Sequence, residues 1–108
     1  MFCKIVAGEI PSTRVAESDR CIAFRDIGPK APTHVLVIPR KHYDSVLQVD
    51  DPALIGEMTA MAKEIAVKEG ISEKGFRLVI NTGAEGGQTV FHLHLHILGG
   101  RQLKWPPG

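Results

Sequence analysis

VFHLHLHILGG, residues 90–100, carries three histidines at every second position, with leucine, leucine and isoleucine between them and two closing glycines. Alternation with a period of two is typical of a β-strand, because successive side chains point to opposite faces of a sheet. The pattern predicts a strand over residues 91–98, with its apolar side chains in the core and its histidines together on the other, open face. The first set is Leu93, Leu95 and Ile97, and the second is His92, His94 and His96.

Three other segments are rich in β-branched and aromatic residues and are bounded by Gly, Pro or Asp, which is typical of strands. They cover residues 21–27, 34–40 and 76–83. Residues 9–18 contain Pro11 and predict a turn that leads into a further strand. The sequence therefore predicts five strands in all.

One segment, residues 52–69, has the period of a helix, because its apolar residues recur on one helical face. Asp51 suits the N-cap, Pro52 the first helical position and Gly70 the position just after the end. The methionines on this face are typical core residues. The predicted inward face consists of Leu54, Ile55, Met58, Met61, Ala62, Ile65 and Ala66.

These elements predict an α+β fold, in which a mostly antiparallel five-stranded sheet packs one main helix on a face. The length of 108 residues suits a single domain over residues 1–108 with one core. Residues 101–108, RQLKWPPG, are too short and too rich in proline to form another element. We expect them to form a C-terminal tail.

The net charge and the cysteines limit which partners and which cellular compartment the sequence suggests. The formal net charge is +1, so the composition indicates neither a nucleic-acid nor a membrane partner. Cys3 and Cys21 have neither the spacing of a paired ligand set nor that of a disulfide framework, which favours a reduced compartment. There is no signal-peptide pattern and no apolar run of the roughly 20 residues that span a bilayer. We therefore expect a soluble cytoplasmic domain.

The triple histidine raises the question of a metal. Residues that follow each other on one face of a strand lie about 7 Å apart, so two of these histidines could chelate one ion. His92 and His96 would lie about 13 Å apart, too far for both to reach one zinc ion at about 2 Å. A zinc site would need His34 or His42 to complete it, without a cysteine pair. The sequence therefore predicts no metal, and it gives His42 only the role of a solvated surface residue.

A phosphate site fits the same histidines better. Neutral imidazole is a good nucleophile toward phosphorus, and an ordinary pKa of about 6.5 leaves it mostly uncharged at neutral pH. The preceding segment contains Gly86, Gly87, Gln88 and Thr89, whose backbone amides and polar side chains could face an anion. Together these features predict a site of phosphoryl or nucleotidyl transfer.

The sequence resembles the histidine triad (HIT) superfamily, and within it the Hint branch of histidine triad nucleotide-binding proteins, which are purine nucleoside phosphoramidases. HLHLHILGG, residues 92–100, matches the triad motif. The resemblance runs almost from end to end, through FCKIVAGEIP at residues 2–11, FRDIGPKAPTHVLVIPRKH at residues 24–42 and the ending LGGRQLKWPPG. That ending resembles Hint proteins rather than the dinucleoside polyphosphate hydrolases.

The resemblance implies hydrolysis of a purine nucleoside 5′-phosphoramidate to the nucleoside monophosphate and an amine. His94 would be the nucleophile and would form a phosphohistidine intermediate, with its other ring nitrogen donating to the backbone carbonyl of His92. His96 would hold the phosphate, and His34 would order the network. No cofactor is implied.

The resemblance also implies which residues bind the nucleotide. Asp26 would accept both ribose hydroxyls, which suits a carboxylate because it can accept two donors. Family members form homodimers by extending the sheet and pairing their helices, and Trp105 in the tail of one subunit would reach toward the active site of the other. The base pocket would consist of Phe2, Phe24, Ile27 and Leu36, and the phosphate contacts of Asn81, Gly87, Gln88 and Thr89.

The chain departs from the family pattern at two positions. Thr89 stands where many Hint sequences have serine, and its methyl group would crowd the leaving group. Cys3 matches the second cysteine of a zinc-binding pair found in some bacterial relatives, whose first cysteine would precede Met1. Two alternative functions stay open, a dinucleoside polyphosphate hydrolase and a nucleotide-binding regulatory module with incidental hydrolysis.

Overall fold

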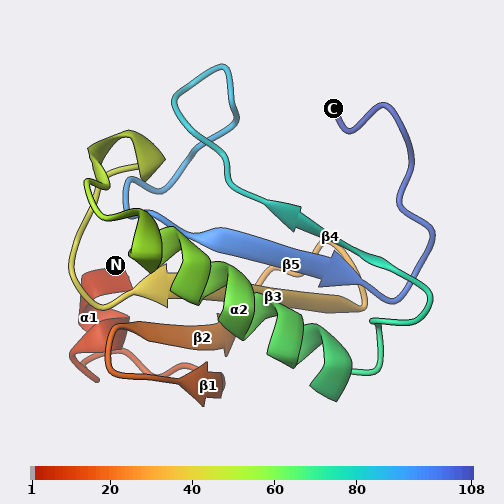
Figure 1. The fold of residues 1–108 in the computed structure, drawn as a ribbon, viewed down its shortest axis with the longest axis horizontal. Coiled ribbons are helices and arrows are strands. Elements are labelled where there is room, and N and C mark those ends of the chain that lie inside the picture. The colour runs from red at the N-terminus through yellow and green to blue at the C-terminus, as the bar shows by residue number, and fades with distance from the viewer. Residues whose placement is uncertain (1) are drawn as a thin grey trace.

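A five-stranded antiparallel sheet forms the centre of the fold in a computed structural model, which describes residues 2–108. The strand order is β1-β2-β3-β5-β4, and the long helix α2 crosses the face of the sheet nearest the viewer in Figure 1. The predicted fold class, a five-stranded sheet with one main helix, is confirmed. The elements are α1 (Phe2–Val6), β1 (Arg14–Glu17), β2 (Cys21–Arg25), β3 (Thr33–Pro39), the 3₁₀ helix η1 (Val46–Gln48), α2 (Pro52–Lys68), β4 (Phe76–Val79) and β5 (Leu95–Gly99).

The central strand β3 is buried along its whole length. It pairs with β2 on one side and with β5 on the other, so no edge of it is free. Val35 and Val37 pack in the main core with α2, while Leu36 and Ile38 pack with α1 in a second, smaller core. The sheet is therefore covered on both faces at β3.

Helix α2 follows its sequence pattern closely and ends one residue earlier than predicted. The Asp51 carboxylate accepts a hydrogen bond from the Ala53 N–H, Pro52 lies in the first turn, and Gly70 follows the helix with a φ of +76°. A positive φ favours glycine because a side chain would be strained there. The face that α2 turns to the sheet buries Leu54, Met58, Ala62, Ile65 and Ala66, with Ile55 and Met61 packed beside them.

The short helix α1, like η1, is not predicted by the sequence pattern. Its five residues are too few to show a helical period. Phe2 and Ile5 pack against Phe24 and Leu36 in the smaller core, on the face of the sheet opposite α2. This helix therefore covers the face toward which the histidines point.

Strand β5 is shorter than the alternating pattern predicts. It begins at Leu95 rather than at residue 91, and the N–H of Leu93 instead donates to the carbonyl of Tyr43 in the loop after β3 (2.7 Å). The alternation itself is confirmed, because the three predicted inward side chains are all buried. The expectation of an open histidine face is wrong, since His92 and His94 are only 3% and 7% exposed beneath α1.

The remaining strands lie in the predicted segments. β2 and β4 end before the predicted limits, at Arg25 and Val79, while β3 begins one residue earlier, at Thr33. The tail, residues 101–108, contains neither a helix nor a strand and follows β5 to the C-terminus (Figure 1). Among the residues that the structure describes, no helix has the length and apolar character needed to cross a bilayer.

Candidate active site

His94 lies just before β5 and keeps one ring nitrogen free. Its Nδ1 lies 2.7 Å from the backbone carbonyl oxygen of His92. A carbonyl oxygen only accepts, so Nδ1 carries the proton and Nε2 keeps its lone pair. The Phe2 ring packs edge to face against the His94 ring at 5.2 Å between centroids and restricts its orientation. The geometry therefore offers His94 Nε2 as a nucleophile.

A chain of hydrogen bonds fixes the protons of His34 and His96. The backbone N–H of Lys30 donates to His34 Nδ1 (3.0 Å), so the proton of His34 lies on Nε2. That Nε2 donates to His96 Nδ1 (2.9 Å), which places the His96 proton on its own Nε2. His96 therefore presents an N–H to its surroundings, whereas His94 presents a lone pair.

The N–H of His96 has no acceptor within the described part of the protein. The Nε2 atom that carries this proton is buried. An unpaired buried donor costs about 1–3 kcal/mol. The ring lies only 4.8 Å from the His94 ring, measured between centroids. An oxygen atom of a ligand that reacts with His94 would satisfy this donor.

Both histidines of this chain of hydrogen bonds are neutral at neutral pH. Burial lowers the pKa of His34, and the nearby Asp26 carboxylate offsets part of that effect. Burial also lowers the pKa of His96 to about 4, and the neighbouring His94 and His34 add to the shift. A neutral imidazole has one donor and one acceptor, so the proton positions above hold at neutral pH.

A polar cavity of about 490 Å³ opens beside these histidines. Lys30 also lines this cavity, although the sequence did not point to it. Its ammonium group donates to the Gly28 carbonyl (3.0 Å). The structure thus brings most of the predicted polar residues to one place. Those that line the cavity are His34, His94, His96, Asp26, Ile27, Asn81, Gly87 and Thr89.

An apolar cavity of about 290 Å³ adjoins the polar one, since Asp26, Thr89 and both His94 and His96 line both. All four residues of the predicted base pocket line it, namely Phe2, Phe24, Ile27 and Leu36. Sequence reasoning missed Ile5, Ile10 and Val90, which also line it and whose apolar character alone does not separate them from core residues.

Asp26 stands between the two cavities with acceptor capacity to spare. Its Oδ1 accepts the backbone N–H of Gly28 (2.8 Å), and its Oδ2 lies 3.5 Å from His34 Nε2. The neighbouring Ile27 is 95% exposed and lies at the mouth of both cavities. The carboxylate is therefore positioned to accept further donors from a ligand.

Gln88 has a different place from the one predicted. Its backbone N–H donates to the Gly83 carbonyl, and its Oε1 accepts the Gly83 N–H. Its Nε2 donates to the carbonyls of Asp44 (2.6 Å) and Val90 (3.1 Å). Because the backbone and side chain are both occupied, Gln88 shapes the loop before the histidines and does not turn its amide toward the cavity.

Trp105 lies away from both cavities of its own chain. Its side chain is 79% exposed, and the Arg77 guanidinium lies 5.9 Å from the ring centroid. Arg77 also donates to the backbone carbonyl of Lys104 (2.9 Å). Since Arg77 belongs to the edge strand β4, the tail is held near that edge.

The surface role predicted for His42 is only partly right. The residue is exposed, but its ring packs edge to face against the buried ring of His92 at 4.8 Å between centroids. Cys3 approaches both rings. These three residues come from distant parts of the sequence, so no local pattern predicts their contact.

The fold and the histidine geometry agree with one known family. The HIT domain matches residues 7–103 of the chain. The chain belongs to the HIT domain family. A HIT family hydrolase from Legionella pneumophila is 53% identical, with a TM-score of 0.96 over 100% of this chain and 98% of that one. A histidine triad protein from Clostridium difficile is 48% identical, with a TM-score of 0.91 over 95% of this chain and 91% of that one.

Relatives of known sequence extend the same family. An uncharacterised HIT-like protein of Synechocystis sp. is 56% identical over 110 aligned positions, which cover 100% of this chain and 96% of that protein. The predicted superfamily is thus confirmed, and the structural relatives include HIT family hydrolases. This HIT protein is accordingly hydrolase-like, and His94 and His96 of its triad line both the polar and the apolar cavity.

Proposed function

We propose that this HIT protein hydrolyses purine nucleoside 5′-phosphoramidates to a nucleoside monophosphate and an amine. One observation carries the proposal. His94 has a free lone pair on Nε2, His96 has an unpaired proton on its buried Nε2, and both residues line both cavities. A nucleophile and a hydrogen-bond donor side by side are what displacement at phosphorus requires.

The first displacement would form a bond from His94 Nε2 to phosphorus and break the phosphorus–nitrogen bond. The departing amine takes up a proton from solvent water, and the His94 ring becomes a phosphoryl-imidazolium that still carries its Nδ1 proton. The backbone carbonyl of His92 accepts from that proton and stabilises the positive ring. The His96 N–H would donate to a non-bridging oxygen as negative charge develops there.

The second displacement would return the enzyme to its starting state. A water molecule attacks phosphorus, gives up a proton, and releases the nucleoside monophosphate as the bond to His94 Nε2 breaks. The nucleoside would stay in place through both steps, with its base in the apolar cavity and its ribose hydroxyls on Asp26.

The test compares two substrates with the purified protein. Adenosine 5′-phosphoramidate with a reporter amine should turn over faster than diadenosine polyphosphates by at least about a hundredfold in kcat/KM. Preference for the dinucleotide would identify a dinucleoside polyphosphate hydrolase instead. Binding of adenosine monophosphate without turnover of either substrate would favour a regulatory module.

We also propose that the protein works as a homodimer. β4 is an edge strand, and all four of its residues are half-buried in the single chain. An edge strand offers unpaired backbone groups, so a second copy can continue the sheet there. Sedimentation at micromolar concentration should give twice the chain mass of 11.8 kDa. A monomer at those concentrations would contradict this assembly.

A further inference from the structure

Lys30 carries a charge that the proposed displacement does not use. Among residues 2–108 it is the only lysine or arginine that lines the polar cavity beside His94 and His96. The acidic side chain of that cavity is Asp26, and both charged groups lie next to Gly28. A Cβ on Gly28 would lie 3.8 Å from Lys30 Nζ and 3.8 Å from Asp26 Oδ1. The cavity therefore has one anionic and one cationic side chain.

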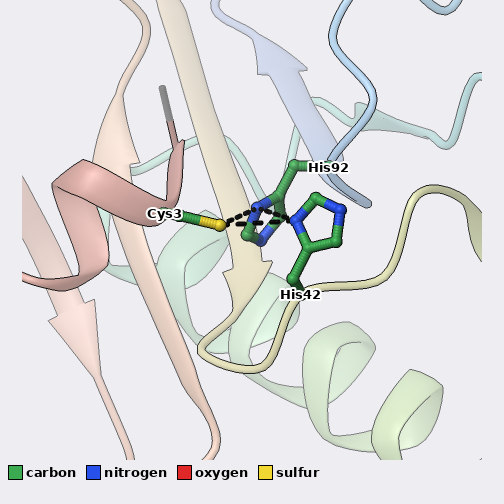
Figure 2. Close-up of side chains that lie close together, drawn as sticks. All are labelled: Cys3, His42 and His92. Carbon is green, nitrogen blue, oxygen red and sulfur yellow. Dashed lines mark hydrogen bonds between the residues drawn. The ribbon is translucent and has the colours of Figure 1, made fainter.

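The histidines do not compete with this positive charge at neutral pH. Burial lowers the pKa of His34, and it lowers the pKa of His96 to about 4. His94 attacks through a free lone pair, so its ring is neutral when it reacts. The other two histidines of the chain lie outside the cavity, where they meet Cys3 (Figure 2). An anionic part of a ligand in this cavity would thus be attracted to Lys30.

Three hydrogen bonds hold Lys30 in place. Its backbone N–H donates to His34 Nδ1 (3.0 Å), and its backbone carbonyl accepts from the Arg101 guanidinium (2.8 Å). Its ammonium group donates to the Gly28 carbonyl (3.0 Å). A free lysine side chain has many rotamers, so these contacts reduce the entropy that a ligand would lose by ordering it.

The ammonium group keeps donors for a ligand. It has three N–H donors, and one of them is used by the Gly28 carbonyl. Within residues 2–108, none of the ion pairs involves Lys30. Two N–H donors with a full positive charge are therefore free to bind an anion.

The proposed reaction places the leaving group in the same cavity. The base occupies the apolar cavity and Asp26 binds the ribose, which leaves the polar cavity of about 490 Å³ for the phosphoryl group and the amine. The attacking and leaving atoms are roughly in line at phosphorus, so the amine departs on the side opposite His94. Its substituents are then the part of the substrate that is free to reach Lys30.

We propose that Lys30 is a specificity-determining residue, which selects phosphoramidates whose amine carries an anionic group, such as a carboxylate. This inference rests on the proposed function, because it concerns the leaving group of the same reaction. The carboxylate would accept the two free N–H donors of Lys30 in charge-assisted hydrogen bonds. The charge lies on the amine, so this contact leaves with the amine when the phosphorus–nitrogen bond breaks.

Two matched substrates test the selection. The adenosine 5′-phosphoramidates of β-alanine and of its uncharged amide differ in charge but hardly in shape. The parent protein should favour the β-alanine compound in kcat/KM by about three- to tenfold, the scale of an exposed charge-assisted contact. This ratio should fall to about one in Lys30→Gln and should invert in Lys30→Glu. It should also shrink in about 1 M salt, where charges are screened within about 3 Å.

A second lysine provides the control. Lys74→Gln removes the same charge from an exposed side chain that lines a different cavity, and it should keep the ratio of the parent protein. An equal fall in Lys74→Gln would mean that net charge alone sets the preference. A loss in Lys30→Gln that is equal for both substrates would place the ammonium group on the phosphate. Either result would overturn selection by Lys30, and circular dichroism excludes simple unfolding of the variants.

A polyphosphate leaving group would bring negative charge to the same place. Diadenosine triphosphate therefore serves as a third substrate for the parent protein. Faster turnover of the β-alanine compound than of the triphosphate supports an anionic amine. The reverse ranking would assign the charge of Lys30 to a polyphosphate and would overturn the inference.

Binding without turnover separates this inference from the proposed function. In His94→Ala, calorimetry measures the affinity of both intact phosphoramidates without the covalent step. The β-alanine compound should bind about three- to tenfold more tightly than the amide, and adding Lys30→Gln should abolish the difference. This difference in binding, together with a parent protein that turns over neither compound, would contradict the proposed function alone. Equal affinities in His94→Ala would overturn selection by Lys30.

Discussion

At the scale of single residues, the site depends on where three protons lie. His94 holds its proton on Nδ1 against a carbonyl, and His34 passes a hydrogen bond from the Lys30 amide to His96. Each partner comes from a different element, so the protons are set by tertiary contacts. One ring is left as a nucleophile and its neighbour as a donor.

Replacing His94 tests its covalent role. His94→Ala should lose on the order of four decades or more in turnover, the scale seen when a nucleophile is removed. Binding of adenosine monophosphate should stay within about tenfold, because Asp26 and the apolar side chains of the predicted base pocket are unchanged. Steady-state kinetic assays measure the turnover, and calorimetry measures the binding of the monophosphate. Turnover within tenfold of the parent protein would rule out the covalent assignment.

The half-buried His96 makes stability depend on pH. Its folded pKa of about 4 lies below the ordinary value of 6.5, so the unfolded chain binds more protons between these two values. The free energy of unfolding should therefore fall as the pH drops from about 6.5 toward 4. Between pH 7 and pH 5 the contribution of His96 is on the order of 1–2 kcal/mol.

Urea unfolding at several pH values measures this slope. His96→Asn keeps an acceptor for His34 and removes one titrating group, so its slope should be shallower than that of the parent protein. The variant should still keep part of the slope, because burial lowers the pKa of His34 in the same direction. Equal slopes in the two proteins would show that His96 titrates normally.

At the scale of elements, the helix ends show how local sequence sets structure. The Asp51 carboxylate caps α2 through the Ala53 N–H and also pairs with Arg20 at 2.9 Å. Asp51→Ala should lower the free energy of unfolding by about 1 kcal/mol, mostly through the cap, since an exposed ion pair contributes little. Asp50→Ala, an exposed neighbour outside the cap, should stay within about 0.5 kcal/mol. Equal losses would mean that the cap is not what Asp51 contributes.

The loop before β5 shows the limit of that local reasoning. A glycine pair and two polar residues predicted a phosphate cradle there. Gly87 and Thr89 do line the cavity, but Gln88 holds the loop to Gly83 and to the loop after β3. Gly86 is required for packing, because a Cβ there would lie 2.3 Å from the Thr82 carbonyl oxygen. The same sequence pattern thus contains both cavity residues and structural ones.

At the scale of the whole molecule, the tail and the edge strand belong together. Arg77 of β4 holds Lys104 and stacks near Trp105, so the tail lies beside the edge where the proposed second copy would add its sheet. Deleting residues 104–108 should change selectivity among amine leaving groups more than affinity for the nucleotide. A panel of phosphoramidates with different amines measures the first, and calorimetry with the monophosphate the second.

A mixing experiment locates the action of the tail. The tail-deleted protein is combined with full-length His94→Ala, and the subunits are allowed to exchange. The mixed dimer has one intact His94, which faces a tail donated by the inactive chain. Full-length selectivity should return at that site. Deletion-like selectivity after confirmed exchange would show that the tail does not act across the dimer.

The sequence by itself determined the five strands, the main helix α2, and which faces of β5 and α2 are apolar. Alternation around His94 and the apolar face between Leu54 and Ala66 depend only on neighbours along the chain, so a local pattern suffices. The recognised motif likewise named many of the residues that line the two cavities, but not Lys30, Ile5, Ile10 or Val90.

Only the tertiary structure decided what closes the histidine face and where the protons and lone pairs point. Helix α1 is too short to leave a periodic signal, yet it buries His92 and His94. Cys3 lies 39 and 89 positions from the histidines that it meets. Contacts over such separations arise when the sheet brings distant segments together, and spacing along the chain carries no record of them.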